Sequence, residues 1–151
     1  MSFYAIILDF SFERSFENLL LIGIAYLLAL PVAWDREVES RSAGLRTFPL
    51  VAVASCAFML IGANTFADDM EALSRALQGI IGGIGFIGGG AILKNNDSVK
   101  GTATAASLWA TGAIGAAVGF GHFEIAIMLS VIAFITLHYL KRLKATVKKS
   151  K

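Results

Sequence analysis

The sequence predicts an all-α protein, a polytopic bundle of transmembrane helices that crosses the bilayer about five times. The first observation is composition: 56% of the 151 residues are hydrophobic and only 16% are charged, whereas soluble domains carry about 25% charged residues. The second is that uncharged, mostly apolar runs alternate with short polar stretches, and each run is close to the length that spans a bilayer. The third is the uneven placement of Lys and Arg.

The five apolar runs are residues 18–34, 47–67, 76–93, 101–123 and 125–140. We expect helices, because backbone groups in lipid must be satisfied internally and these runs lack the alternation of barrel strands. The chain shows neither a linker nor a separate soluble domain. Residues 1–151 are therefore expected to form a single transmembrane domain that ends in a basic tail, residues 141–151.

Basic residues gather on one side of the predicted membrane. Eleven of the 13 Lys and Arg residues follow the first run, follow the third run or lie in the tail, which leaves Arg14 and Arg75 on the other side. Cytoplasmic loops carry the excess of basic residues, so we expect the N-terminus outside and the C-terminus in the cytoplasm. The tail is expected to meet anionic lipid, and not nucleic acid, because no nucleic-acid-recognition motif accompanies it.

Glycine is concentrated in the third run, where seven glycines each cost about 1 kcal/mol of helix stability relative to Ala. Small residues four positions apart let transmembrane helices approach closely. We therefore expect helix packing at glycines of the third and fourth runs: Gly79, Gly83, Gly85, Gly88, Gly89, Gly115 and Gly119. A discontinuous helix that lines a polar site is the alternative. The G-x-G-x-x-G pattern at 83–88 is not interpreted as a dinucleotide site, because it lies in the middle of a span.

Asp35 follows the first apolar run directly, and ionisable residues at such boundaries are often functional. An unpaired charge is costly beside the low-dielectric interior of the membrane, so we expect Asp35 to pair with Arg36 or Arg46. The alternative is that each charge points into water. Carboxylate and backbone oxygens are ligands that Mg²⁺ prefers, but no set of metal ligands can be assigned from the sequence.

Other polar residues admit simpler interpretations. Asn64 lies at the outer end of the second run, where a cap or turn is the default and cation attraction the alternative. Thr104, Ser107 and Thr111 share one face of the fourth run, and their hydroxyls can bond carbonyls of their own helix. Trp109 lies between them, in the middle of the span.

Catalytic and cofactor motifs are not apparent. His122 and His138 have no Cys, Asp or Glu at the spacing of zinc ligands. The sequence contains no nucleophile elbow, HExxH or P-loop pattern. We therefore expect neither an enzyme nor a bound cofactor.

Three stretches resemble the MgtC/SapB family in residues, order and spacing: AGLRT at 43–47, GIGFIGGG at 83–90 and VKGTATAASLW at 99–109. The resemblance covers about residues 19–121. Arg75 matches an Arg that precedes the family's glycine run. The sequence departs from the family where Ala33-Trp34-Asp35-Arg36 replaces the usual G-x-E-R, although an acid still precedes the Arg.

The resemblance implies a bacterial inner-membrane protein linked to magnesium limitation. Two roles stay open: a regulator of other membrane proteins, such as a cation-transporting ATPase or ATP synthase, and a transporter or channel for Mg²⁺ or another cation. Transporters often show paired broken helices in matched halves, and only the third run looks breakable, which favours the regulator. We also expect a homo-oligomer, because short glycine-rich helices leave surfaces that need partners. Some family members carry a soluble C-terminal domain, and the sequence resembles the membrane part alone.

Overall fold

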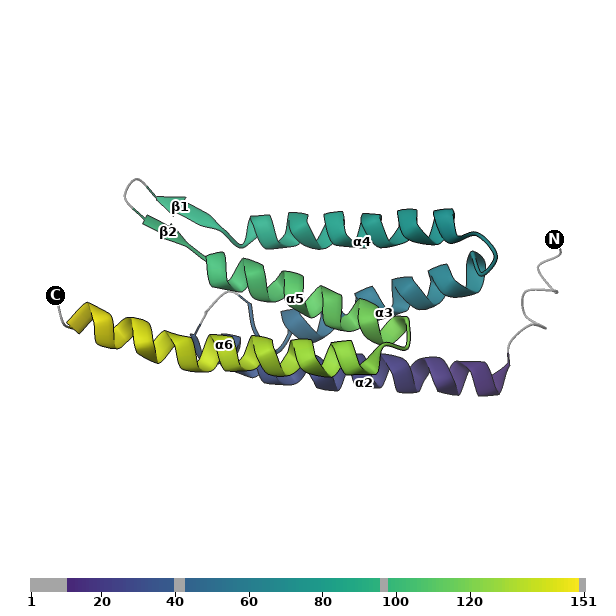
Figure 1. Ribbon diagram of the computed structural model, residues 1–151, viewed down its shortest axis with the longest axis horizontal. Coiled ribbons are helices and arrows are strands. Elements are labelled where there is room, and N and C mark those ends of the chain that lie inside the picture. The colour runs from purple at the N-terminus through teal and green to yellow at the C-terminus, as the bar shows by residue number, and fades with distance from the viewer. Residues whose placement is uncertain (1–10, 40–42, 96–97, 150–151) are drawn as a thin grey trace.

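The computed structural model describes residues 11–39, 43–95 and 98–149. In chain order they form α2 (Phe12–Glu39), α3 (Thr47–Thr65), α4 (Met70–Gly90), β1 (Leu93–Asn95), β2 (Ser98–Lys100), α5 (Thr102–Gly119) and α6 (Phe123–Lys149). The helices run side by side along the long axis of the molecule and alternate in direction (Figure 1). The predicted helical class is confirmed, with one short β-hairpin added.

Three of the described helices are long and apolar enough to cross a membrane: α2, α3 and residues 123–140 of α6. The other two predicted spans coincide with α4, which has 21 residues, and α5, which has 18. Glycines together with Glu71 and Arg75 make α4 less apolar, and glycines together with Thr and Ser residues do so for α5. The crossing of the membrane by all five helices therefore stays a prediction.

The third predicted run ends earlier than expected. Helix α4 stops at Gly90, and Leu93 pairs with Lys100 in the antiparallel hairpin. Gly101 then connects the hairpin to α5 with φ +86°, and a Cβ at this position would overlap the carbonyl oxygen of Ala91. Only glycine adopts this conformation at little cost. The Lys-Gly-Thr stretch of the sequence is thus the joint between hairpin and helix.

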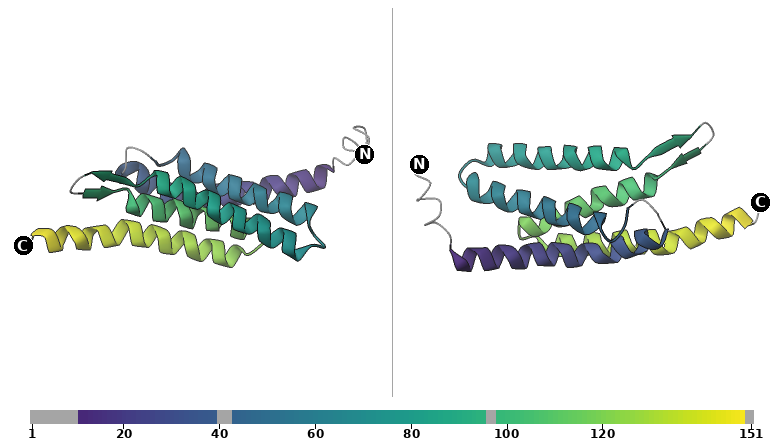
Figure 2. Two further views of the ribbon diagram at one scale, coloured as in Figure 1. Left: turned by 90° about the horizontal axis from the view of Figure 1, so that it is seen from above. Right: turned by 180° about the vertical axis from the view of Figure 1, so that it is seen from behind.

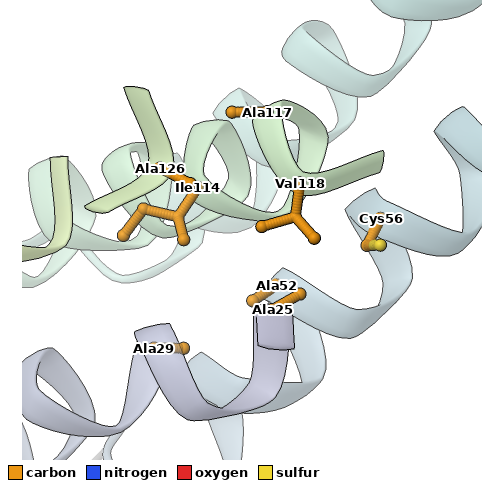
Figure 3. Packing of buried hydrophobic residues seen from close by; sticks show 8 residues of the cluster. All are labelled: Ala25, Ala29, Ala52, Cys56, Ile114, Ala117, Val118 and Ala126. Atoms are coloured by element: carbon orange, nitrogen blue, oxygen red, sulfur yellow. The ribbon is translucent and has the colours of Figure 1, made fainter. Parts of the chain in front are cut away.

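Helix α5 occupies the centre of the bundle. It contacts each of the other four helices described, and eleven of its 18 residues are buried. One core cluster joins α5 to α2, α3 and α6, and most of its members are alanines: Ala25, Ala29, Ala52, Cys56, Ile114, Ala117, Val118 and Ala126 (Figure 3). Such small side chains let the helix backbones lie close together.

Helix α4 lies at the edge of the bundle, and packs mainly against α5 and less extensively against α3. Only Ile84 and Gly88 of this helix are buried. Its first turn is capped by Asp69, whose side chain accepts the N–H of Ala72 at 2.9 Å. The helix is continuous from Met70 to Gly90. The alternative of a discontinuous glycine-rich helix is therefore wrong for this structure.

The connections gather at two opposite ends of the bundle (Figures 1 and 2). The start of α2, the α3–α4 connection at 66–69 and the α5–α6 turn at 120–122 share one end, which we call the turn end. The hairpin, the start of α3 and the C-terminal end of α6 share the other, which we call the hairpin end. Helices α2 and α6 therefore run toward the same end.

Candidate functional site at the hairpin end

A buried ion pair lies near the end of α2. The Arg36 Nη2 donates to Asp35 Oδ2 at 2.6 Å, and the two side chains are only 6% and 10% exposed. Adjacent residues on a helix do not normally face each other, so both side chains must turn into the bundle to meet. The structure thus joins Asp35 to Arg36, one of its two predicted partners. Arg46, the other, is exposed.

His138 of α6 completes the pair from across the bundle. Its Nδ1 lies 3.2 Å from Asp35 Oδ1, and an ionised carboxylate only accepts hydrogen bonds, so Nδ1 carries the proton. The imidazole stacks on Phe134, with ring centroids 5.4 Å apart, and meets Tyr139 edge-on. These contacts hold the His138 ring in place. Asp35 therefore accepts bonds from two helices, α2 and α6.

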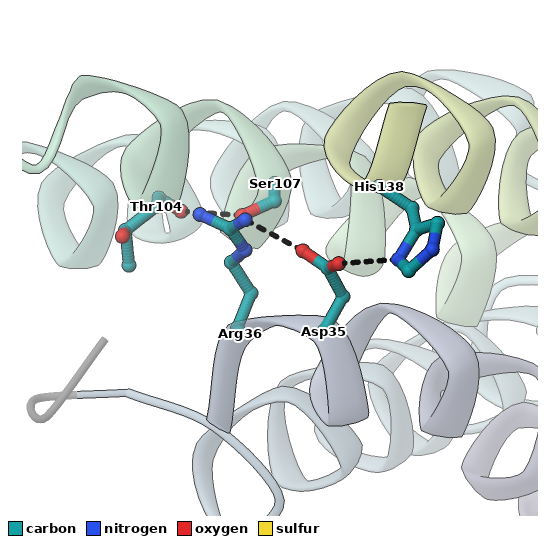
Figure 4. A network of polar contacts seen from close by, with 5 residues as sticks. All are labelled: Asp35, Arg36, Thr104, Ser107 and His138. Atoms are coloured by element: carbon teal, nitrogen blue, oxygen red, sulfur yellow. Dashed lines mark hydrogen bonds and ion pairs between the residues drawn. The ribbon is translucent and has the colours of Figure 1, made fainter. Parts of the chain in front are cut away.

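Helix α5 forms the remaining wall of the site. Figure 4 shows the Arg36 guanidinium between the Asp35 carboxylate and the backbone of α5 at Thr104 and Ser107. The Ser107 hydroxyl donates to the Thr104 carbonyl at 3.0 Å, and the Thr111 hydroxyl donates to the Ser107 carbonyl at 2.8 Å. The hydroxyls of Ser107 and Thr111 are thus bonded within their own helix, as the sequence predicted.

The ion pair itself lies within α2, and the hydrogen bond between His138 and Asp35 links α2 to α6. Removal of one partner from a buried ion pair leaves an uncompensated charge and costs about 3–5 kcal/mol. The Arg36 Nε is buried and has no hydrogen-bond partner in the described part of the chain. Among the same residues, no group of three or more His, Cys, Asp or Glu side chains could hold a metal ion. The cluster therefore combines an ion pair within α2 with a hydrogen bond from α6.

The other predicted polar residues lie outside the cluster. Asn64 is exposed at the end of α3. Arg75 is exposed on α4 and pairs with Glu71 one turn away, at the turn end. Trp109 is 53% exposed on α5 and lines a small hollow of about 240 Å³ against α4. Of the predicted polar set, the structure brings together only Asp35, Arg36 and Thr104.

The predicted packing glycines divide into two groups. A Cβ at Gly115 would overlap the Ala52 carbonyl oxygen, one at Gly119 would lie 2.8 Å from the Cys56 carbonyl oxygen, and one at Gly88 would lie 3.2 Å from that of Ala105. These three glycines are in close helix–helix contact. At the other four, all on α4, a Cβ would meet nothing within 4 Å among the described residues: Gly79, Gly83, Gly85 and Gly89.

The AGLRT stretch forms the tight turn that starts α3. The Gly44 carbonyl accepts the N–H groups of Thr47 and Phe48 at 3.0 and 3.1 Å. A Cβ at Gly44 would overlap Glu37 of α2, whose carboxylate accepts the Leu45 N–H at 2.9 Å. The turn is thereby fixed to α2 close to the Asp35–Arg36 pair.

His138 is the member of the site that sequence reasoning missed, because it was considered only as a zinc ligand. A signal was available. Two helices that run in the same direction place the ends of the first and last spans at one end of the bundle. Asp35 and His138 both lie near those ends, so an ionisable residue in each could have been paired.

The length and apolar composition of the helices indicate a helical membrane protein. Comparison with known proteins identifies the family. The sequence model of the MgtC family matches residues 22–146, and this chain belongs to that family. No solved structure matches the chain.

Several curated proteins are similar to the chain. It is 35% identical to protein SrpB of Synechococcus elongatus, over 80% of this chain and 73% of SrpB. It is 34% identical to the "Putative magnesium transporter YhiD" of Escherichia coli K12, over 84% of this chain and 62% of YhiD. It is 36% identical to protein MgtC of Salmonella typhimurium, over 78% of this chain but only 49% of that protein. The chain thus spans about half to three quarters of these relatives.

Proposed function

We propose that this chain is a bacterial inner-membrane protein that acts in Mg²⁺ homeostasis as a regulator or accessory of another membrane protein. The observation that carries the proposal is an exposed glycine face on α4. Gly82, Gly85 and Gly89 lie three and four positions apart, on one side of the helix, and a Cβ on any of them would meet nothing within 4 Å. We call this the partner face.

Glycine in a helix reduces its stability by about 1 kcal/mol relative to Ala. In lipid, close contact with a neighbouring helix offsets that cost. At Gly115 and Gly119 this neighbour is α3, whereas at the partner face the described part of the chain supplies none. A helix of a second membrane protein, either another copy or a distinct partner such as an ATPase, would supply the contact.

The proposal includes five membrane crossings with the hairpin end in the cytoplasm. Lys94, Lys100 and Arg46 all lie at the hairpin end, whereas Arg75 lies near the turn end, and this distribution agrees with the excess of basic residues on cytoplasmic sides. The modest hydropathy of α5 does not argue against a crossing. Most of its surface is covered by other helices and not by lipid.

Cation transport is the second candidate function, favoured by the name of the relative YhiD. The described residues support it less well. The Asp35 carboxylate, the anionic group of the buried cluster, is already paired with Arg36. A continuous α4 also lacks the unwound backbone with which transporters coordinate ions.

The test is Gly85→Leu in a strain that depends on this chain for growth at limiting Mg²⁺. We expect the variant to accumulate in the membrane, because the new side chain meets no other part of the described structure. We expect it not to support growth, because the same side chain would obstruct a helix docked on the partner face. Gly85→Ala is the matched control and should retain most of the activity. Growth of the Gly85→Leu strain at the rate of the parent would rule out the partner face.

A further inference from the structure

An apolar groove separates α3 from α4. The two helices diverge from their shared connection at 66–69 toward the hairpin end (Figure 1), and their packing is the least extensive among the helix pairs in substantial contact. The groove has a volume of about 840 Å³ and is open to the surface. Its walls are almost entirely apolar and include Leu50, Ala54, Phe58, Gly79, Ile80 and Gly83.

Among the described residues, a single cationic one lines this groove, Arg46, at its hairpin end. Arg46 is exposed and makes no ion pair or side-chain hydrogen bond with any described residue. Thr47, the next residue along the chain, also lines the groove. The Thr47 and Phe48 N–H groups are bonded to the Gly44 carbonyl and Pro49 has no N–H, so these three positions offer no free backbone donor. The Arg46 guanidinium is therefore the cationic hydrogen-bond donor that the described residues offer on this wall.

We propose that the groove binds an anionic glycerophospholipid from the leaflet at the hairpin end. The acyl chains lie along the apolar walls, and the phosphate pairs with Arg46, whose planar guanidinium matches phosphate oxygens in two parallel hydrogen bonds. The volume falls within the roughly 300–1,000 Å³ of ligand sites. Basic pockets between membrane helices are known to select anionic head groups.

A lipid fits this groove better than a helix of a second protein. A helix is about 10–12 Å wide with its side chains and would have to place an acidic residue beside Arg46. A flexible chain fills an irregular wedge without that requirement. The groove and the partner face also use different glycines of α4. Gly79 and Gly83 line the groove, whereas the partner-face glycines Gly82, Gly85 and Gly89 do not. The lipid site is therefore independent of the partner face.

The test is native mass spectrometry of the purified chain with added lipids. Phosphatidylglycerol and phosphatidylcholine with identical acyl chains are the probes. One cation near the membrane contributes about 1 kcal/mol, so we expect roughly fivefold preference for phosphatidylglycerol. Arg46→Gln should reduce the preference to about equality, and Arg46→Lys should keep part of it. Arg75→Gln, an exposed Arg at the turn end, is the matched control and should change nothing.

A second variant tests the groove itself. Gly83→Leu adds a side chain where a Cβ meets no atom within 4 Å, so the fold is retained while the groove is filled, and bound phosphatidylglycerol should be lost. Glycerol phosphate, which has no acyl chains, should not compete. Equal retention of phosphatidylglycerol and phosphatidylcholine by the parent would overturn the proposal. So would an unchanged preference for phosphatidylglycerol in Arg46→Gln, or displacement of the bound lipid by glycerol phosphate. A parent protein that is a dimer without bound lipid, and that Gly83→Leu converts to a monomer, would show that a second copy fills the groove instead.

Discussion

Replacement of Gly115 by alanine is expected to force α3 and α5 apart. The added Cβ would overlap the Ala52 carbonyl oxygen and would lie 2.8 and 2.9 Å from the carbonyl carbon and Cα of Ala52. Ordinary van der Waals contact begins at 3.4 Å. To bring the Cβ from 2.8 Å to that distance from the Ala52 carbonyl carbon, the two helices must separate by at least about 0.6 Å. All three atoms belong to the backbone and cannot rotate away.

The energetic consequence follows from two opposing terms. Overpacking of a well-packed core costs about 1–3 kcal/mol, and a steric conflict with backbone places this site near the upper value. The exchange of Gly for Ala in a helix returns about 1 kcal/mol. We therefore expect Gly115→Ala to lower the free energy of unfolding by about 1–2 kcal/mol. Helices α3 and α5 form the most extensive pair in the bundle, so the effect should be global.

The assay is equilibrium unfolding of the purified protein in detergent, followed by circular dichroism. Gly85→Ala is the matched control, because it is the same chemical change at a site where a Cβ meets nothing within 4 Å. It should be neutral or stabilising by up to about 1 kcal/mol. If Gly115→Ala is as stable as the parent, or both variants are destabilised equally, the packing argument is refuted.

Three further predictions concern topology, charge and an interhelical bond. Reporter enzymes fused after Lys151 should act as cytoplasmic, and those inserted at 66–69 as external; an external signal from the former contradicts the orientation. Asp35→Ala should destabilise the purified protein by about 3–5 kcal/mol, because it leaves Arg36 buried and uncompensated. The exchange of both residues, Asp35→Arg with Arg36→Asp, should recover part of that loss in the same unfolding assay, and no recovery would contradict the pairing. Ser130→Ala removes the 2.7 Å bond to the Leu28 carbonyl and should cost about 0.6 kcal/mol in unfolding experiments, with a loss above about 2 kcal/mol contradicting a simple interhelical bond.

The helices of the bundle could largely be predicted from the sequence, because a long run without charged residues indicates a segment that is buried away from water. The start of the second helix at Thr47 agrees with the boundary expected from composition. The hairpin at 93–100 could not be anticipated in this way. Its strands are three residues long, too short for a periodic pattern, and the turn glycine Gly101 was interpreted only as part of a span.

The glycine patterns show where spacing stops being informative. Gly115 and Gly119 stand four apart, as do Gly85 and Gly89, yet only the first pair touches another helix of this chain. Spacing identifies a smooth face but not the element that covers it. That depends on the position of each helix, and α5 is central whereas α4 lies at the edge.

The charged site was partly predictable for a related reason. The apolar run before Asp35 indicated that its charge would need a partner, and Arg36 was one of the two considered. The bond to His138 depends on a residue 103 positions away, and local spacing carries no information about such a contact. Only the shared direction of α2 and α6 brings the two side chains together.

The central claim, that the chain acts through helix–helix contact and does not itself move Mg²⁺, is tested most directly by flux. The purified protein alone would be reconstituted into sealed liposomes that contain a fluorescent Mg²⁺ indicator, with an ionophore as positive control. We predict that Mg²⁺ entry equals that of protein-free liposomes at every protein-to-lipid ratio. Entry that rises in proportion to the protein and falls in the Asp35→Ala variant would contradict the claim and establish the chain as a transporter.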